Sequence, residues 1–223
     1  SGGYVAATTE VDLQLSMENC ATCHARREEL TANGFKAGER FFDHYRLTLP
    51  DTPGAYYADG QALEEDYVYA SFMMSRMGHK GVTCMDCHNP HSGDPILPVQ
   101  SNALCMRCHA TGENESIVID PLAHSHHQVD STGNQCISCH MPERTYMVRD
   151  PRRDHGFSSP DPQLTIDHGI PNTCNTCHTD ESTEWALGHV NTWFGETDRR
   201  KHVQQRAKTL TDAHAGSPGA LAQ

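Results

Sequence analysis

Residues 81–92 read Gly-Val-Thr-Cys-Met-Asp-Cys-His-Asn-Pro-His-Ser, and they contain the pattern Cys84-x-x-Cys87-His88. The pattern occurs five times and uses all ten cysteines of the chain. The five motifs are Cys20-Ala-Thr-Cys23-His24, Cys84-Met-Asp-Cys87-His88, Cys105-Met-Arg-Cys108-His109, Cys136-Ile-Ser-Cys139-His140 and Cys174-Asn-Thr-Cys177-His178. Two thiols three positions apart reach the two vinyl groups on one porphyrin edge, and the following histidine binds the iron. The sequence therefore predicts five covalently bound haem c groups, each with a motif histidine as proximal iron ligand.

Paired cysteines have two other common uses in proteins. Ten cysteines can form five disulfides, and Cys-x-x-Cys pairs can bind zinc. Neither use explains why a histidine follows the second cysteine of every pair. Haem attachment is the reading that accounts for the whole pattern.

Composition excludes several classes of protein. The 223 residues include 17 Lys and Arg against 29 Asp and Glu, which gives a formal net charge of −12. An acidic chain lacks the basic patch that binding to nucleic acid requires. No apolar run approaches the roughly 20 residues of a membrane span. We therefore expect no nucleic-acid partner and no membrane span.

The haem content also predicts the fold class. Only 36% of the residues are hydrophobic and 7% aromatic, which is little for a chain that must fill its own core. We expect a mainly α structure with extensive loops, in which the haem stack forms the core and there is little or no β-sheet. Cys84 and Cys105 begin motifs only 21 residues apart, so their haems are expected to be neighbours.

Local patterns divide the chain into three parts. We expect an extended arm over residues 1–19, a pentahaem domain over 20–195, and a C-terminal helix and tail over 196–223. The finer expectations are an extended or strand-like Tyr4–Leu15, a helix over Tyr67–Met77, a helix capped by Asp180 that ends at Gly195, and a last helix capped by Thr197 with the apolar stripe Val203, Ala207 and Leu210.

Eleven histidines remain as candidates for the second axial ligand of each iron. His91 follows His88 by three residues, too short a span to pass round a porphyrin, so it would serve a neighbouring haem. Asp154 is placed to orient His155. The predicted distal ligands are His44, His79, His91, His124, His127 and His155. His126 is kept as a spare and His168 as a weaker candidate, while the remaining ones, and ligation by methionine, are disfavoured.

The chain resembles the haem-bearing region of multihaem c-type cytochromes that carry tetratricopeptide or similar helical repeats at their C-terminus. The stretches that carry this resemblance lie within residues 20–195; they are 20–27, 57–61, 81–92, Cys139-His-Met-Pro142, Tyr146-Met147, Arg152-Arg-Asp-His155 and 171–178. The resemblance implies ligand roles for His91, for a histidine of residues 124–127 and for His155. It implies none for His168.

The chain departs from that family in two ways. Relatives usually have further haem motifs upstream and a repeat array downstream, and neither is seen in these 223 residues. We therefore expect a reduced or trimmed version, and partner binding through repeats is not carried over. The start Ser1-Gly2-Gly3 shows no charged, apolar-cored leader, so we expect a mature secreted chain whose signal peptide has been removed.

These features predict electron transfer, because a six-coordinate haem has no open site for substrate. We expect a periplasmic or extracellular carrier whose partners are other redox proteins or terminal electron acceptors. Two forms stay open: a shuttle or complex subunit, and a polymeric filament with haem contact between subunits. The alternative is a nitrite, hydroxylamine or sulfur-oxyanion reductase with one five-coordinate catalytic haem; we expect no catalytic residue of the chain itself.

Overall fold

The computed structural model describes residues 13–65 and 67–217. Most of its regular structure is short helices, and Cys84–Cys87 and Cys174–Cys177 are single turns. The elements in chain order are α1 Leu13–His24, β1 Arg27–Glu29, α2 Phe41–His44, β2 Tyr45–Leu47, α3 Tyr69–Met74, α4 Arg76–His79, α5 Cys84–Cys87, α6 Ala103–His109, η1 Glu113–Glu115, α7 Pro121–Ser125, η2 Thr132–Asn134, α8 Cys136–His140, β3 Glu143–Tyr146, β4 Asp150–Arg153, α9 Pro162–His168, α10 Cys174–Cys177, α11 Thr183–Phe194 and α12 Asp198–His214. The expected mainly helical fold class with long loops is confirmed.

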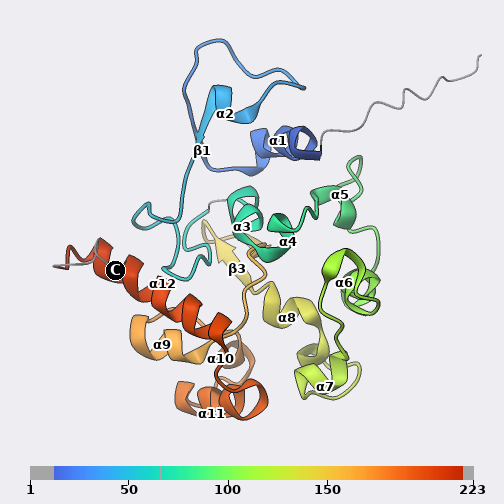
Figure 1. The fold of residues 1–223 in the computed structure, drawn as a ribbon, viewed down its shortest axis with the longest axis vertical. Helices are drawn as coiled ribbons and strands as arrows, with labels where there is room; N and C mark the ends of the chain where they lie inside the picture. Colours follow the sequence, from blue (N-terminus) through green and yellow to red (C-terminus); the bar gives the residue numbers. More distant parts are fainter. Residues whose placement is uncertain (1–12, 66, 218–223) are drawn as a thin grey trace, which may run out of the picture.

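Extended structure in the described residues is limited to two small antiparallel ribbons and isolated bridges. β1 pairs with β2, with Arg27 opposite Leu47, and β3 pairs with β4, with Glu143 opposite Arg153. Figure 1 shows α1 and α2 at one end of the molecule, α9, α11 and α12 at the other, and α6 and α7 to one side. The expectation of little sheet is therefore confirmed.

Buried apolar side chains form three separate clusters. The first joins α1, α2 and α3 around Phe41, the second surrounds Tyr56, and the third packs Leu164 of α9 against Ala207 of α12. Between Phe72 and Tyr146, Ile137 is the only hydrophobic side chain that is buried among the described residues. The segment that contains motifs two, three and four therefore has almost no side-chain core of its own.

The first cluster also buries a carboxylate. Glu18 of α1 is 0% exposed; its side chain accepts hydrogen bonds from Arg40 at 2.6 Å and from the backbone N–H of Phe41 at 2.8 Å. A buried charge is tolerated when it is paired and hydrogen-bonded. This contact fastens motif one, at the end of α1, to α2.

The last two helices agree closely with the sequence-based expectation. α11 is followed by Gly195 at φ +62°, and the hydroxyl of Thr197 caps α12 by accepting from the N–H of Arg200. Ala207 is fully buried against α9. The cap of α11 was predicted wrongly, because Ser182 and not Asp180 accepts the hydrogen bond from Trp185.

Two further expectations need correction. The predicted helix over Tyr67–Met77 is broken into α3 and α4, because Ser75 is extended at ψ 156° and its hydroxyl accepts from Gly78 to cap α4. The N-terminal arm is shorter than predicted, since α1 already begins at Leu13. Residues 1–12, which hold most of the strand-like tail expected over Tyr4–Leu15, lie outside the described residues.

Candidate haem-binding site

The two cysteines of every motif lie within one helix. Residues three apart lie on the same face of a helix, so both thiols of a motif point the same way. In motif two, the Asp86 carboxylate accepts from the backbone N–H and hydroxyl of Thr83 at 2.7 and 2.8 Å, which fixes the start of α5. All ten cysteines are described and none forms a disulfide. The structure thus leaves the thiols available for haem attachment.

Three of the five motif histidines face a second imidazole. The ring centroids of His88 and His155 are 6.3 Å apart with 26° between the planes, and those of His124 and His140 are 5.9 Å apart with 21° between them. His127 and His178 are 6.1 Å apart at 41°. His155, His124 and His127 are distal candidates from the sequence, and the fold brings each of them opposite a different motif.

Four of these six histidines, and also His109 of motif three, are oriented by hydrogen bonds to backbone carbonyls. Nδ1 of His88 lies 2.7 Å from the carbonyl oxygen of Gly93, and that of His140 lies 2.8 Å from Ser158. The corresponding contacts of three further rings are His109 to Ile117 at 2.9 Å, His155 to Arg153 at 2.9 Å and His127 to Ser125 at 2.6 Å. A carbonyl next to Nδ1 selects the tautomer with a proton there, which leaves Nε2 free to bind a metal.

Burial favours the neutral form of these rings. Desolvation lowers the pKa of His124, His140 and His155 below the ordinary value for histidine. A metal ligand must be the neutral imidazole, so a lowered pKa suits ligation.

Thiols of successive motifs lie next to one another. Burial and then the nearby thiol of Cys20 raise the pKa of Cys84 to about 12. The nearby thiol of Cys136 and then burial raise the pKa of Cys105. Cys87 is close enough to Cys108, and Cys139 to Cys174, for the second thiol to raise the pKa of the first. Motifs one to five therefore follow one another in space in the order of the sequence.

Three predicted ligands lie outside the facing pairs. Nε2 of His44 lies 3.0 Å from the carboxylate of Glu39, and its Nδ1 lies 3.1 Å from the hydroxyl of Thr31. His79 ends α4 and His91 lies in the loop after α5, and both are exposed. The structure therefore brings none of the three opposite a motif histidine among the described residues.

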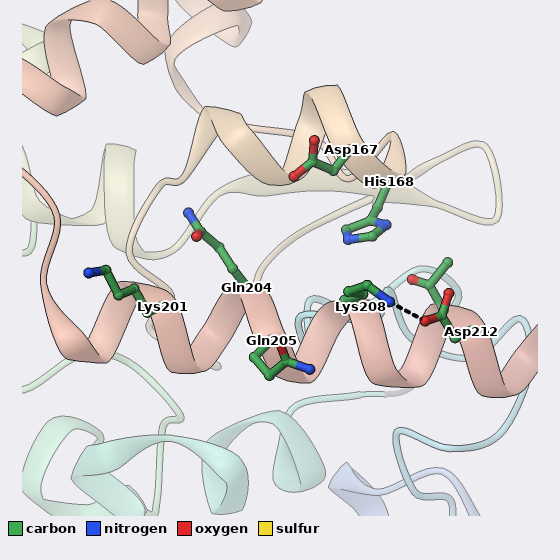
Figure 2. Close-up of a pocket in the computed structure, with 8 residues that line it drawn as sticks. Asp167, His168, Lys201, Gln204, Gln205, Lys208 and Asp212 are labelled. Carbon is green, nitrogen blue, oxygen red and sulfur yellow. Dashed lines mark hydrogen bonds and ion pairs between the residues drawn. The ribbon is translucent and has the colours of Figure 1, made fainter. Parts of the chain in front are cut away.

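The weaker candidate His168 lies elsewhere. It ends α9 and borders a polar groove between α9 and α12 that is lined by Gln204, Lys208 and Asp212 (Figure 2). No motif residue lines this groove.

The aromatic residues of α11 surround the C-terminal sites. Trp185 lies 4.9 Å from the ring of His178, and Trp193 stacks on His126 at 4.4 Å with 14° between the planes. His189 lies between the two tryptophans, 4.5 Å from Trp185. The two tryptophans and His189 therefore form one row of rings along α11, next to His126 and His178.

Comparison with known proteins agrees with this geometry. A family model described as a doubled CXXCH motif matches residues 78–114, which hold motifs two and three. The crystal structure of the outer cell wall cytochrome OcwA is similar at a TM-score of 0.59 and 17% sequence identity. The similarity covers 92% of this chain and 56% of that chain, so this chain spans little more than half the length of OcwA. No curated protein matches the sequence.

Within residues 13–65 and 67–217, no helix is both long and apolar enough to cross a membrane. The five CXXCH motifs and the match to a doubled CXXCH motif support covalent attachment of haem c, and the fold is similar to that of a cytochrome.

Proposed function

We propose that this chain carries electrons along a row of five covalently bound haem c groups. The observation that carries the proposal is the set of three facing imidazole pairs. Two axial nitrogens, each about 2 Å from one metal, stand about 4 Å apart, and each ring centre lies about 1 Å behind its nitrogen. The centroid separations of 5.9 to 6.3 Å fit this requirement.

In this proposal each motif supplies two thioether links and a proximal histidine. His155, His124 and His127 are the distal ligands for the motifs of His88, His140 and His178. His79 and His91 stay candidates for the other two sites, and His44 is less suited because both of its ring nitrogens have protein partners. A bound haem c supplies a one-electron iron couple whose potential depends on ligand identity, burial and charge.

The arrangement of the motifs supports conduction. Thiols of successive motifs are neighbours from Cys20 to Cys174, so haems attached there would also be neighbours in sequence order. The segment between Phe72 and Tyr146 has little buried apolar surface apart from Ile137. Haems would supply that core while forming the row.

We also propose a place outside the cytoplasmic membrane, because the similar cytochrome OcwA is described as an outer cell wall protein. The net charge of −12 favours partners with a basic surface, and their association should weaken as salt is added. Three kinds of partner fit this proposal: a second redox protein, a terminal acceptor or another copy in a filament. Electron microscopy at several protein concentrations separates the last from the first two, since compact particles throughout would exclude the filament.

The test is the spin state of the purified holoprotein. Intact mass and haem absorbance should give five haems per chain. EPR and optical spectra should show low-spin haem at the three paired sites, with no binding of nitrite or carbon monoxide there. High-spin haem at three or more sites would contradict the proposal.

One observation favours a second function. Among the described residues, no imidazole faces His24 or His109, so in this second proposal a five-coordinate haem would lie at one of these two sites. Such a site would serve reduction of a small oxyanion such as nitrite. A high-spin fraction near one haem in five that binds nitrite would support the reductase.

A further inference from the structure

One short segment supplies the second imidazole at two different haem sites. His124 faces His140 of motif four, and His127 faces His178 of motif five. The two rings are three residues apart in the chain, but one faces the last residue of α8 and the other faces the residue that follows α10. We call residues 124–127 the shared turn.

His126 sets the direction of this turn. It follows α7 with φ +58° and ψ 22°, in the left-handed region, and its backbone N–H donates to the carbonyl of Leu122. Few residues other than glycine adopt this conformation, and β-branched residues avoid it. The reversal of the chain at His126 allows the imidazoles on either side of it to face different motifs.

The end of α11 holds the turn in place. The His126 ring stacks on Trp193, and Phe194 lies 5.2 Å from His124 and 6.1 Å from His126. Trp193 also meets the edge of His127 at 6.5 Å. Two adjacent aromatic residues thus contact all three histidines.

A polar network fixes the second half of the turn. The backbone N–H of His127 donates to Oγ of Ser125 at 3.2 Å, and that hydroxyl donates to Asn134 at 2.9 Å. Asn102, which precedes motif three, donates from its side chain to the carbonyl of Asn134 at 2.7 Å and accepts from the N–H of Cys136 at 2.8 Å.

Gly133 lies directly against the imidazole ring of His127. A Cβ at position 133 would stand 2.2 Å from Cδ2 and 2.6 Å from Cγ of His127. Any larger residue there must push the imidazole out of its place.

We infer that His126 is a positioning residue whose left-handed backbone holds the distal ligands of the fourth and fifth haems together, so that the two sites gain or lose their sixth ligand as a unit. This inference rests on the proposed function, because it takes His124 and His127 as ligands. Gly133 has the narrower role of seating His127 alone.

The test counts open haems by titrating the reduced, fully loaded protein with carbon monoxide, alongside low-spin EPR intensity. H126V should bind two more equivalents per chain than the unmodified protein. G133A should bind one more. H126N should bind no more carbon monoxide than the unmodified protein, because asparagine tolerates positive φ and its planar amide can lie on Trp193. H202A, which removes an exposed histidine of α12, should also bind no additional carbon monoxide.

Two reference variants separate the inference from the proposed function. H124A and H127A should each bind one additional equivalent. If neither does, the ligand assignment is wrong and the inference falls with it. If both do, but H126V binds fewer than two or H126N binds as many as H126V, the inference alone is overturned. If H126V does not acquire its haems, H126A decides by the same criteria, because alanine also disfavours positive φ without adding bulk.

Discussion

The imidazole of His155 lies nearly parallel to that of His88, with ring centroids 6.3 Å apart and 26° between the planes. The two residues are 67 positions apart in the chain. Carbonyl groups of Gly93 and Arg153 lie next to the Nδ1 atoms of His88 and His155, which leaves both Nε2 atoms free to bind a metal. The spacing of the two rings fits the proposal that they are the axial ligands of one iron.

Replacing His155 should open the haem site of motif two. In H155A we expect one more high-spin haem per chain, because His88 alone then binds the iron. Carbon monoxide titration and EPR measure the change. H168A is the matched control, since His168 borders the groove between α9 and α12 and no motif residue lines that groove. An unchanged low-spin spectrum in H155A would exclude His155 as a ligand.

Asp154 should stabilise the fold beside that ligand. It is 6% exposed, and its carboxylate accepts from the N–H of Ala62 at 2.9 Å and from that of Gly156 at 2.6 Å. Hydrogen bonds to a charged group contribute about 1.5–3 kcal/mol, so D154A should lower the free energy of unfolding by about 3 kcal/mol. Urea denaturation followed by circular dichroism measures it.

The control for D154A is E64A, at an exposed carboxylate, which should stay within about 0.5 kcal/mol of the unmodified protein. Equal decreases in the free energy of unfolding in D154A and E64A would contradict a structural role for Asp154.

The contact between α9 and α12 should depend on one buried ion pair. Asp161 accepts from Arg200 at 2.8 Å and from Gln204 at 2.7 Å, with the Asp161 and Arg200 side chains 5% and 13% exposed. Removing one partner leaves the other charge buried, so D161A and R200A should each cost about 3 kcal/mol of unfolding free energy. The double variant should cost clearly less than the sum of both, as a double-mutant cycle would show. Strict additivity would mean that the pair is not coupled.

Asp59 should give a pH dependence of stability of the opposite sign to that of most carboxylates. Burial raises its pKa above the ordinary 3.8, against the lowering effect of hydrogen bonds from Gln61. The folded state therefore holds the proton more tightly than the unfolded state. The contribution of Asp59 to the free energy of unfolding is full below pH 3.8 and is lost as pH rises through the raised pKa.

D59N should remove this loss. The stability of D59N relative to the unmodified protein should therefore rise from acidic pH toward neutral pH, measured by urea denaturation at several pH values. A difference that is constant with pH would show that Asp59 titrates alike in both states.

Much of the binding site could be predicted from the sequence because haem attachment is a local property. The Cys-x-x-Cys-His spacing alone places two thiols and an imidazole on one turn, whatever surrounds it. Helix ends were predicted equally well where the signal is local, as for Thr197 and Gly195. The prediction over Tyr67–Met77 was wrong because Ser75 caps a new helix there and Gly78 packs against the carbonyl of Phe72, a contact that no periodic pattern reveals.

By itself the sequence determined the attachment chemistry, the mainly helical class and the list of histidines able to serve as second ligands. Only the tertiary structure decided which of them face a motif: His155, His124 and His127 do, whereas His44 turns to Glu39. The reason is physical. A proximal ligand is fixed by the covalent chain next to its thiols, but a distal ligand must approach the opposite face of the porphyrin from another part of the chain. Its position therefore depends on turns such as His126 and on distant packing such as Trp193, which the folded chain alone brings together.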